Sequence, residues 1–168
     1  MSNINIHLMC GIPASGKTTW INAEVARLME ENRSAVRVSR DDIRKVMIGD
    51  GEYFSKEKEV FKAFIDEINE CIKLGFEDIY IDATHINKAS RHKVLSQLKP
   101  NHSSTLIIEV MPFVVEKCIE FNNKREGFAK VPEEAIRNMN EKWEEPTIEE
   151  FSNFIKPNFF AKVKINYI

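Results

Sequence analysis

The chain has 168 residues, 43% of them hydrophobic and 30% charged, with a formal net charge of −2. These values are typical of one folded domain with a sizeable core, and the net charge argues against a nucleic-acid binder whose whole surface is basic. A local basic funnel is compatible with that charge, because the placement of charges matters more than their sum.

Apolar, β-prone runs alternate along the chain with segments of helical spacing. The runs cover 4–10, 36–39, 78–82, 105–111 and 162–168. Helices are expected over 55–74 (ending at Gly75), after Asn87, from Pro132, and after a capping box of Thr147 and Glu150. Strands that alternate with helices predict right-handed crossovers and a mainly parallel, five-stranded sheet with helices on both faces. We therefore expect one α/β domain over 1–168.

The first apolar run leads directly into Gly11–Thr18, which fits the phosphate-loop pattern G-x-x-x-x-G-K-[ST] without a mismatch. A helical stretch follows, and this strand–loop–helix context separates such a loop from a chance glycine-rich turn. Glycines let backbone N–H groups point at phosphate oxygens, and the helix start adds partial positive charge. Lys17 is expected to reach the β- and γ-phosphates, and the Thr18 hydroxyl to ligand Mg²⁺. The expected ATP contacts are Gly11, Ala14, Ser15, Gly16, Lys17, Thr18 and Thr19.

Charged residues follow the next two runs, at the sheet edge where open parallel sheets bind ligands. Asp41 can accept a proton from an attacking hydroxyl, or it can cap the next helix unless Asp42 does so. Arg44 lies on the same helical face and can hold a substrate phosphate, or it can stay solvated. We expect Arg40 to form a structural ion pair. Asp82 can help hold Mg²⁺ through water, or it can form a turn.

Two irregular segments are expected to be loops beside the site, because mobile segments often carry function. The polar segment 122–131 is predicted to be a lid that brings Arg125 onto the nucleotide, where it stabilises charge on the transferring phosphoryl group. The alternative is a solvated basic loop. The segment 48–54 ends in Tyr53 and Phe54, which either join the core or stack on a base.

The cysteines and histidines argue against metal or redox chemistry. The three cysteines lie far apart among apolar residues without a C-x-x-C pair, and His85 and His92 lack a third ligand. Such cysteines predict reduced, buried thiols and hence a cytoplasmic protein. No apolar run approaches the ~20 residues that span a bilayer, so we expect no membrane partner.

Four blocks in order resemble the kinase domain of the phage-type 5′-hydroxyl polynucleotide kinases, within the wider P-loop kinase group. These blocks are Gly11–Trp20, Ser39–Arg44, Asp82–Arg91 and Asn122–Met139. The resemblance implies a P-loop kinase-like three-layer sandwich that transfers the γ-phosphoryl group of ATP, with Mg²⁺, to the 5′-hydroxyl end of DNA or RNA. It also implies the cytosol of a bacterium or of a phage-infected host, and roles for residues already singled out. Lys17 and Thr18 would bind the ATP phosphates and Mg²⁺. Asp41 would be the general base, Arg44 a contact to the phosphate beside the reacting hydroxyl, and Arg125 the lid arginine.

The chain departs from this family's pattern at His85, where the family often has Asn, and at Phe121, where some relatives carry another basic residue. The wider group phosphorylates quite different hydroxyls, so a nucleoside, a nucleotide or another small hydroxyl compound is the second candidate acceptor. A nucleotide-dependent switch is the third candidate. It is disfavoured because the segment 123–126 has Glu where a guanine-reading N-K-x-D motif has Asp.

Overall fold

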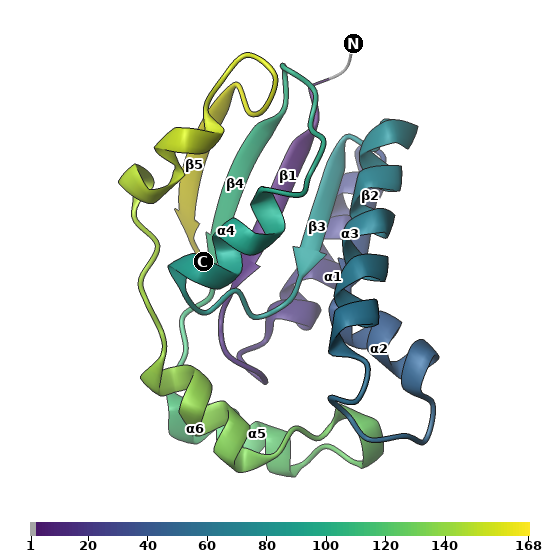
Figure 1. Cartoon of the computed structure of the whole chain (residues 1–168), viewed down its shortest axis with the longest axis vertical. Coiled ribbons are helices and arrows are strands. Elements are labelled where there is room, and N and C mark those ends of the chain that lie inside the picture. Colours follow the sequence, from purple (N-terminus) through teal and green to yellow (C-terminus); the bar gives the residue numbers. More distant parts are fainter. Residues whose placement is uncertain (1–2) are drawn as a thin grey trace.

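The computed structural model describes residues 3–168 and contains a five-stranded, all-parallel sheet in the order β2-β3-β1-β4-β5, with helices on both faces (Figure 1). The strands are β1 (Asn5–Cys10), β2 (Ala35–Ser39), β3 (Asp78–Asp82), β4 (Thr105–Val110) and β5 (Lys162–Tyr167). The helices are α1 (Lys17–Glu30), α2 (Arg40–Ile48), α3 (Glu57–Leu74), α4 (Lys88–Leu95), α5 (Val115–Asn123), α6 (Glu133–Glu141) and the 3-10 turns η1 (Gly127–Ala129) and η2 (Ile148–Phe154). The predicted three-layer α/β fold is confirmed, with a fully parallel sheet.

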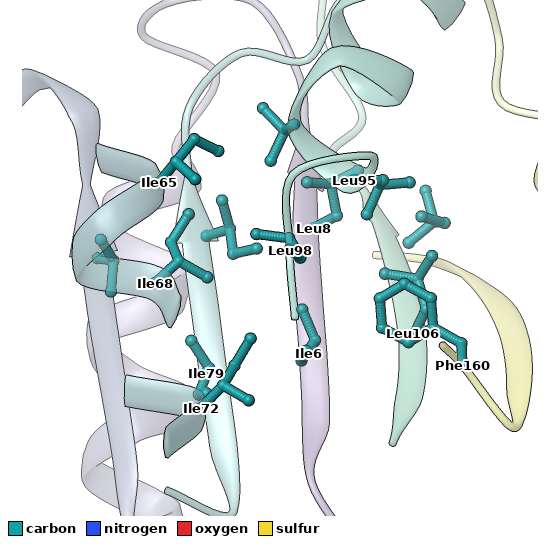
Figure 2. Close-up of a cluster of buried hydrophobic side chains, with 14 of the residues drawn as sticks. Ile6, Leu8, Ile65, Ile68, Ile72, Ile79, Leu95, Leu98, Leu106 and Phe160 are labelled. Atoms are coloured by element: carbon teal, nitrogen blue, oxygen red, sulfur yellow. The ribbon is translucent and has the colours of Figure 1, made fainter. Parts of the chain in front are cut away.

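The main hydrophobic core lies between one face of the sheet and the helices α3 and α4 (Figure 2). Strands of a parallel sheet are buried on both faces, which explains why they appear in the sequence as continuous apolar runs. Helix α3 contributes buried side chains at helical spacing. The residues labelled in Figure 2 are Ile6, Leu8, Ile65, Ile68, Ile72, Ile79, Leu95, Leu98, Leu106 and Phe160.

The helix ends largely follow the signals in the sequence. Gly75 ends α3 in the left-handed conformation, with φ of 80°. Asn87 caps α4, and Thr147 forms the predicted capping box at η2. Pro132 occupies the N-cap of α6, one residue earlier than the first helical position expected for it. No helix within residues 3–168 is long and apolar enough to cross a bilayer.

A buried polar network lies on the opposite face of the sheet from the main core. His7 of β1 bonds Glu109 through Nδ1 at 2.8 Å and Asp78 through Nε2 at 3.0 Å, and its ring stacks on Tyr80. Burial opposes the charged imidazolium, but the two carboxylates outweigh this and raise the pKa of His7. Arg33 also pairs with Asp78. The network therefore ties three adjacent strands together through charge.

We expect His7→Gln to lower the free energy of unfolding by about 3 kcal/mol, because it leaves Glu109 buried without a cation, while Asp78 keeps only Arg33. The raised pKa means that this stabilisation is present below the unfolded value of about 6.5 and is lost as the pH rises through the folded value. Urea unfolding at pH 6 and pH 9 measures both effects. His102→Gln, on an exposed turn, is the control, and equal stability of the two variants would contradict the prediction.

Candidate active site at the carboxyl ends of the strands

The loop Gly11–Thr18 connects β1 to α1 in a tight turn. Ala14 and Gly16 have positive φ angles of 59° and 93°, which turn successive peptide groups inward. A side chain at Gly11 would place its Cβ 2.8 Å from the Ser15 Oγ and 3.1 Å from the Met111 Cβ. Helix α1 begins at Lys17, so its N-terminus faces the inside of the loop. The segment thus has the form of an anion cradle.

Lys17 places its ammonium group inside this cradle. Its Nζ donates hydrogen bonds to the backbone oxygens of Gly11 and Ile12, both at 2.8 Å, and the side chain is buried. Burial lowers the pKa of Lys17, while the charges of Asp82 and Asp41 act to raise it. The positive charge of Lys17 therefore lies inside the loop, where an anion would bind.

Thr18 and Asp82, both predicted to help hold Mg²⁺, are in contact at the rim of the cradle. The Thr18 Oγ1 donates to the Asp82 Oδ2 at 2.9 Å, and Arg37 of β2 donates its Nε–H to the same oxygen at 2.8 Å. Asp82 is buried at the end of β3, so protein groups rather than water hold its carboxylate in one orientation. Arg37 is a neighbour of this site that the sequence analysis did not identify.

Helix α2 carries Asp41 and Arg44, and neither Asp41 nor Asp42 caps it. The N-cap is Ser39, whose side chain accepts a hydrogen bond from the Asp42 backbone N–H. The alternative that Asp41 or Asp42 caps this helix is therefore wrong. The Asp41 carboxylate is free for other contacts, and it accepts hydrogen bonds from the Arg44 Nη1 and, at 3.1 Å, from the Tyr53 hydroxyl.

Arg44 is buried, so the alternative of a solvated surface arginine is wrong. Glu57 at the start of α3 accepts from its Nε at 2.6 Å and its Nη2 at 3.0 Å, which is the forked geometry of a strong carboxylate pair. Arg40 also donates to Glu57, at 2.8 Å, and forms the structural pair expected of it. Burial alone would raise the pKa of Glu57, but Arg44 and Arg40 outweigh it and lower this pKa. Glu57 thus fixes the guanidinium that faces Asp41.

The side chain of Asn122 joins the two ends of the predicted lid segment 122–131. The Asn122 amide donates to the Val131 backbone oxygen at 2.7 Å and accepts from the Val131 N–H at 2.9 Å. Between them Arg125 is exposed, with a long contact of 3.4 Å to the Ala129 oxygen. Arg137 pairs with Glu116 and Glu133 on an exposed face of α6 and does not contribute to the pocket described next.

One pocket brings predicted site residues together; it is lined by the phosphate loop, α2, the end of β3, the predicted lid and α6. Figure 1 shows α5 and α6 below the carboxyl ends of the strands. Gly11 and Ser15 belong to the loop but do not line the pocket. His85 is also outside it. Its Nδ1 bonds the Met9 oxygen, and burial lowers its pKa to about 3, which keeps the ring neutral. The predicted residues that line the pocket are Ala14, Gly16, Lys17, Thr18, Thr19, Asp41, Arg44, Asp82 and Arg125.

Comparison with known proteins shows the family of the chain. A family model described as an AAA domain, AAA_33, matches residues 6–146, most of the chain. The chain belongs to this family, within the P-loop kinase superfamily. L-seryl-tRNA(Sec) kinase of Methanococcus maripaludis is 26% identical over 146 residues, which cover 83% of this chain and 52% of that protein. The chain therefore spans about half the length of this curated relative.

Solved structures show the same P-loop kinase fold. A chain of the Pnkp1/Rnl/Hen1 RNA repair complex is 22% identical with a TM-score of 0.64, and the match covers 84% of this chain and 44% of that one. Kti12 of Chaetomium thermophilum, solved with ADP-AlF3, is 18% identical with a TM-score of 0.63, and the match covers 96% and 88%. At these identities the likeness shows the fold alone, and the acceptor has to be argued from the site.

The P-loop kinase's own residues fit ATP and Mg²⁺. The cradle at Gly11 leaves no room for a side chain, and Lys17 supplies a buried cation within it. The adjacent hydroxyl of Thr18 and carboxylate of Asp82 are the hard oxygen donors that Mg²⁺ prefers. Within residues 3–168 no cluster of three His, Cys, Asp or Glu side chains can hold a metal ion, and all three cysteines are buried free thiols.

We expect Asp82→Asn in this P-loop kinase to raise the Mg²⁺ concentration needed for half-maximal activity by about tenfold or more, because a group that orients a metal ligand is typically worth that much. Titration of activity with MgCl₂ measures the effect. Asp66→Asn, which makes the same chemical change on the exposed side of α3, provides the matched control. An unchanged Mg²⁺ requirement in Asp82→Asn would remove this carboxylate from the proposed metal site.

Proposed function

We propose that this P-loop kinase transfers the γ-phosphoryl group of ATP to the 5′-hydroxyl end of DNA or RNA. The observation that supports it best is the pairing of Asp41 and Arg44 on one wall of the pocket that also contains Lys17. A carboxylate suits a hydroxyl that must lose a proton, and a guanidinium suits a phosphate close to it. A nucleic-acid end presents both groups together, whereas a free nucleoside presents the hydroxyl alone.

In the proposed reaction Asp41 is the general base. The acceptor oxygen forms a bond to the γ-phosphorus, the bond from that phosphorus to ADP breaks, and Asp41 takes the hydroxyl proton. Arg44 orients the acceptor, and Lys17 stabilises the negative charge that spreads over the transferring group. Mg²⁺, when held by Thr18 and by Asp82 through water, supplies further positive charge at the phosphates.

We assign the segment 122–131 as the lid of a single kinase domain over 1–168. Arg125 lines the same pocket as Lys17, and its side chain is not committed to an acidic partner. It is therefore available to contact the nucleotide when the segment closes, and closure would exclude water from the reaction. The hydrogen bonds between Asn122 and Val131 give the segment two fixed ends about which to move.

One of the similar proteins supports an acceptor attached to nucleic acid, because it is named as a kinase of L-seryl-tRNA(Sec). The charges beside Asp41 favour a smaller acceptor instead, because Glu57 neutralises part of the positive charge that Arg40 and Arg44 bring. We therefore retain a nucleoside, a nucleotide or another small hydroxyl compound as the second candidate.

The proposal is tested by offering γ-labelled ATP with separate acceptors. The acceptors are a 5′-OH oligodeoxynucleotide, the matching oligoribonucleotide, the same oligomers with a 5′-phosphate, free nucleosides and no acceptor. We expect label on the 5′-OH oligomers only. Label on nucleosides alone would establish the second candidate. Hydrolysis without transfer to any of these acceptors would contradict a nucleic-acid end and a nucleoside as the acceptor, and would favour a nucleotide-dependent switch.

A further inference from the structure

We propose that Tyr53 sets the affinity for the acceptor, because its hydroxyl occupies the place beside both Asp41 and Arg44 that an acceptor hydroxyl would take. An acceptor that binds there has to displace the Tyr53 hydroxyl. The inference rests on the proposed function, in which Asp41 receives the acceptor proton. It adds that a side chain of the protein, Tyr53, competes with the acceptor for Asp41.

The hydrogen bonds of Tyr53 carry the inference. Its hydroxyl donates to the Asp41 Oδ1 at 3.1 Å, within the 2.6–3.2 Å reach expected between a general base and the proton it removes. The same hydroxyl accepts from the Arg44 Nη1 at 3.2 Å. It therefore engages both groups that we assign to the acceptor. A second hydroxyl cannot donate to that carboxylate oxygen in the same direction while Tyr53 stays in place.

The ring of Tyr53 is held by contacts that do not involve its hydroxyl. The Arg44 guanidinium lies 4.6 Å from the ring centroid, and the rings of Phe54 and Phe128 lie 4.5 Å and 5.0 Å away. Such contacts add stabilisation beyond buried area. Removing only the hydroxyl should therefore leave the ring in place, which makes Tyr53→Phe a clean test of the proposal.

Tyr53 can move without unwinding a helix. It lies between the end of α2 at Ile48 and the start of α3 at Glu57. The link begins at Gly49, which has a positive φ of 60° that favours glycine. Its contact with Phe128 connects this link to the proposed lid, and the two segments approach each other in Figure 1. Displacement of Tyr53 and movement of the lid are therefore expected to occur together.

The physical consequence is competition at Asp41. Burial raises the pKa of Tyr53 to about 12, so it competes as a neutral hydroxyl that donates a proton to the carboxylate. The free energy of acceptor binding is reduced by the cost of breaking the hydrogen bonds of Tyr53 to Asp41 and Arg44. Both bonds involve a charged partner, and such hydrogen bonds contribute more than bonds between neutral groups, so their loss corresponds to at least a several-fold change in affinity. The hydroxyl is thus expected to raise the KM for the acceptor without stabilising the transition state.

The test is steady-state kinetics of Tyr53→Phe with saturating γ-labelled ATP and varied 5′-OH oligonucleotide. We expect the KM for the oligonucleotide to fall about three- to tenfold, while kcat and the KM for ATP stay within about twofold of the wild-type values. Tyr167→Phe, which removes an exposed phenol hydroxyl on β5, is the matched control and should change neither constant. Thermal unfolding of each variant checks that the fold is intact.

Each other outcome overturns the proposal. An unchanged KM would assign Tyr53 a structural role only, and a raised KM would mean that its hydroxyl binds the acceptor instead of yielding to it. Failure of the proposed function is visible separately, because the wild-type protein would then label no 5′-OH oligonucleotide at all. Wild-type transfer combined with an unchanged KM in Tyr53→Phe contradicts the inference alone.

Discussion

Replacement of Lys17 by alanine is expected to lower kcat for phosphoryl transfer by about a hundredfold or more. The ammonium group lies inside the loop that begins at Gly11, buried and bonded to two backbone oxygens. A cation preorganised in this way stabilises the charge that develops on the transferring phosphoryl group, and the loss of one such donor typically costs 10²–10³ in rate, about 2.7–4 kcal/mol. The measurement is kcat with γ-labelled ATP and the best acceptor found.

Lys164→Ala is the matched control for this change. Lys164 lies at the edge of the sheet on β5, so the variant loses the same charge far from the pocket. We expect it to keep wild-type turnover. A folded Lys17→Ala protein with kcat within threefold of wild type would show that the loop does not hold the reacting phosphates.

Asp41→Asn is expected to lower kcat by about 10²–10⁴, the range that a positioned proton acceptor contributes. The amide has nearly the shape of the carboxylate and can still accept a hydrogen bond from Arg44, so the local packing should persist. What is lost is the capacity to take the acceptor proton. Because binding contacts are largely retained, the KM for the acceptor should change much less than kcat.

The control for Asp41→Asn is Asp66→Asn on the exposed side of α3, where Asp66 pairs only with Lys62. It makes the same chemical change and should leave both constants unaltered. Near-wild-type turnover in folded Asp41→Asn would remove Asp41 from the role of base, and the proposed position of the acceptor would fall with it.

The sequence predicts the fold well because the decisive signals are local. Buried strands of a parallel sheet appear as continuous apolar runs, and the phosphate loop is one uninterrupted pattern at Gly11–Thr18. Gly75, Asn87 and Thr147 mark helix ends through contacts with residues only a few positions away. The rule that ligands bind at the strand ends then places Asp41 beside Lys17 without further information.

The parts of the site that the sequence does not predict depend on contacts between elements. Glu57 appears in the sequence as an ordinary acidic residue in the first turn of a helix, and only the packing of α3 on α2 brings it to Arg44. Tyr53 was considered for its ring, whereas the structure shows a hydroxyl directed at Asp41. Ser39 is the N-cap, but the sequence alone does not select it, because Asp41 and Asp42 close behind it carry the same capping signal.

The central claim is that the donor phosphates and the acceptor hydroxyl meet in one pocket between Lys17 and Asp41. The most direct measurement is a crystal structure with Mg²⁺, a non-hydrolysable ATP analogue and a 5′-OH oligonucleotide bound together. We predict the γ-phosphate on Lys17, the 5′-oxygen within hydrogen-bonding distance of Asp41, and the Tyr53 hydroxyl moved away. A 5′-end bound elsewhere, with Asp41 still bonded to Tyr53, would contradict the account.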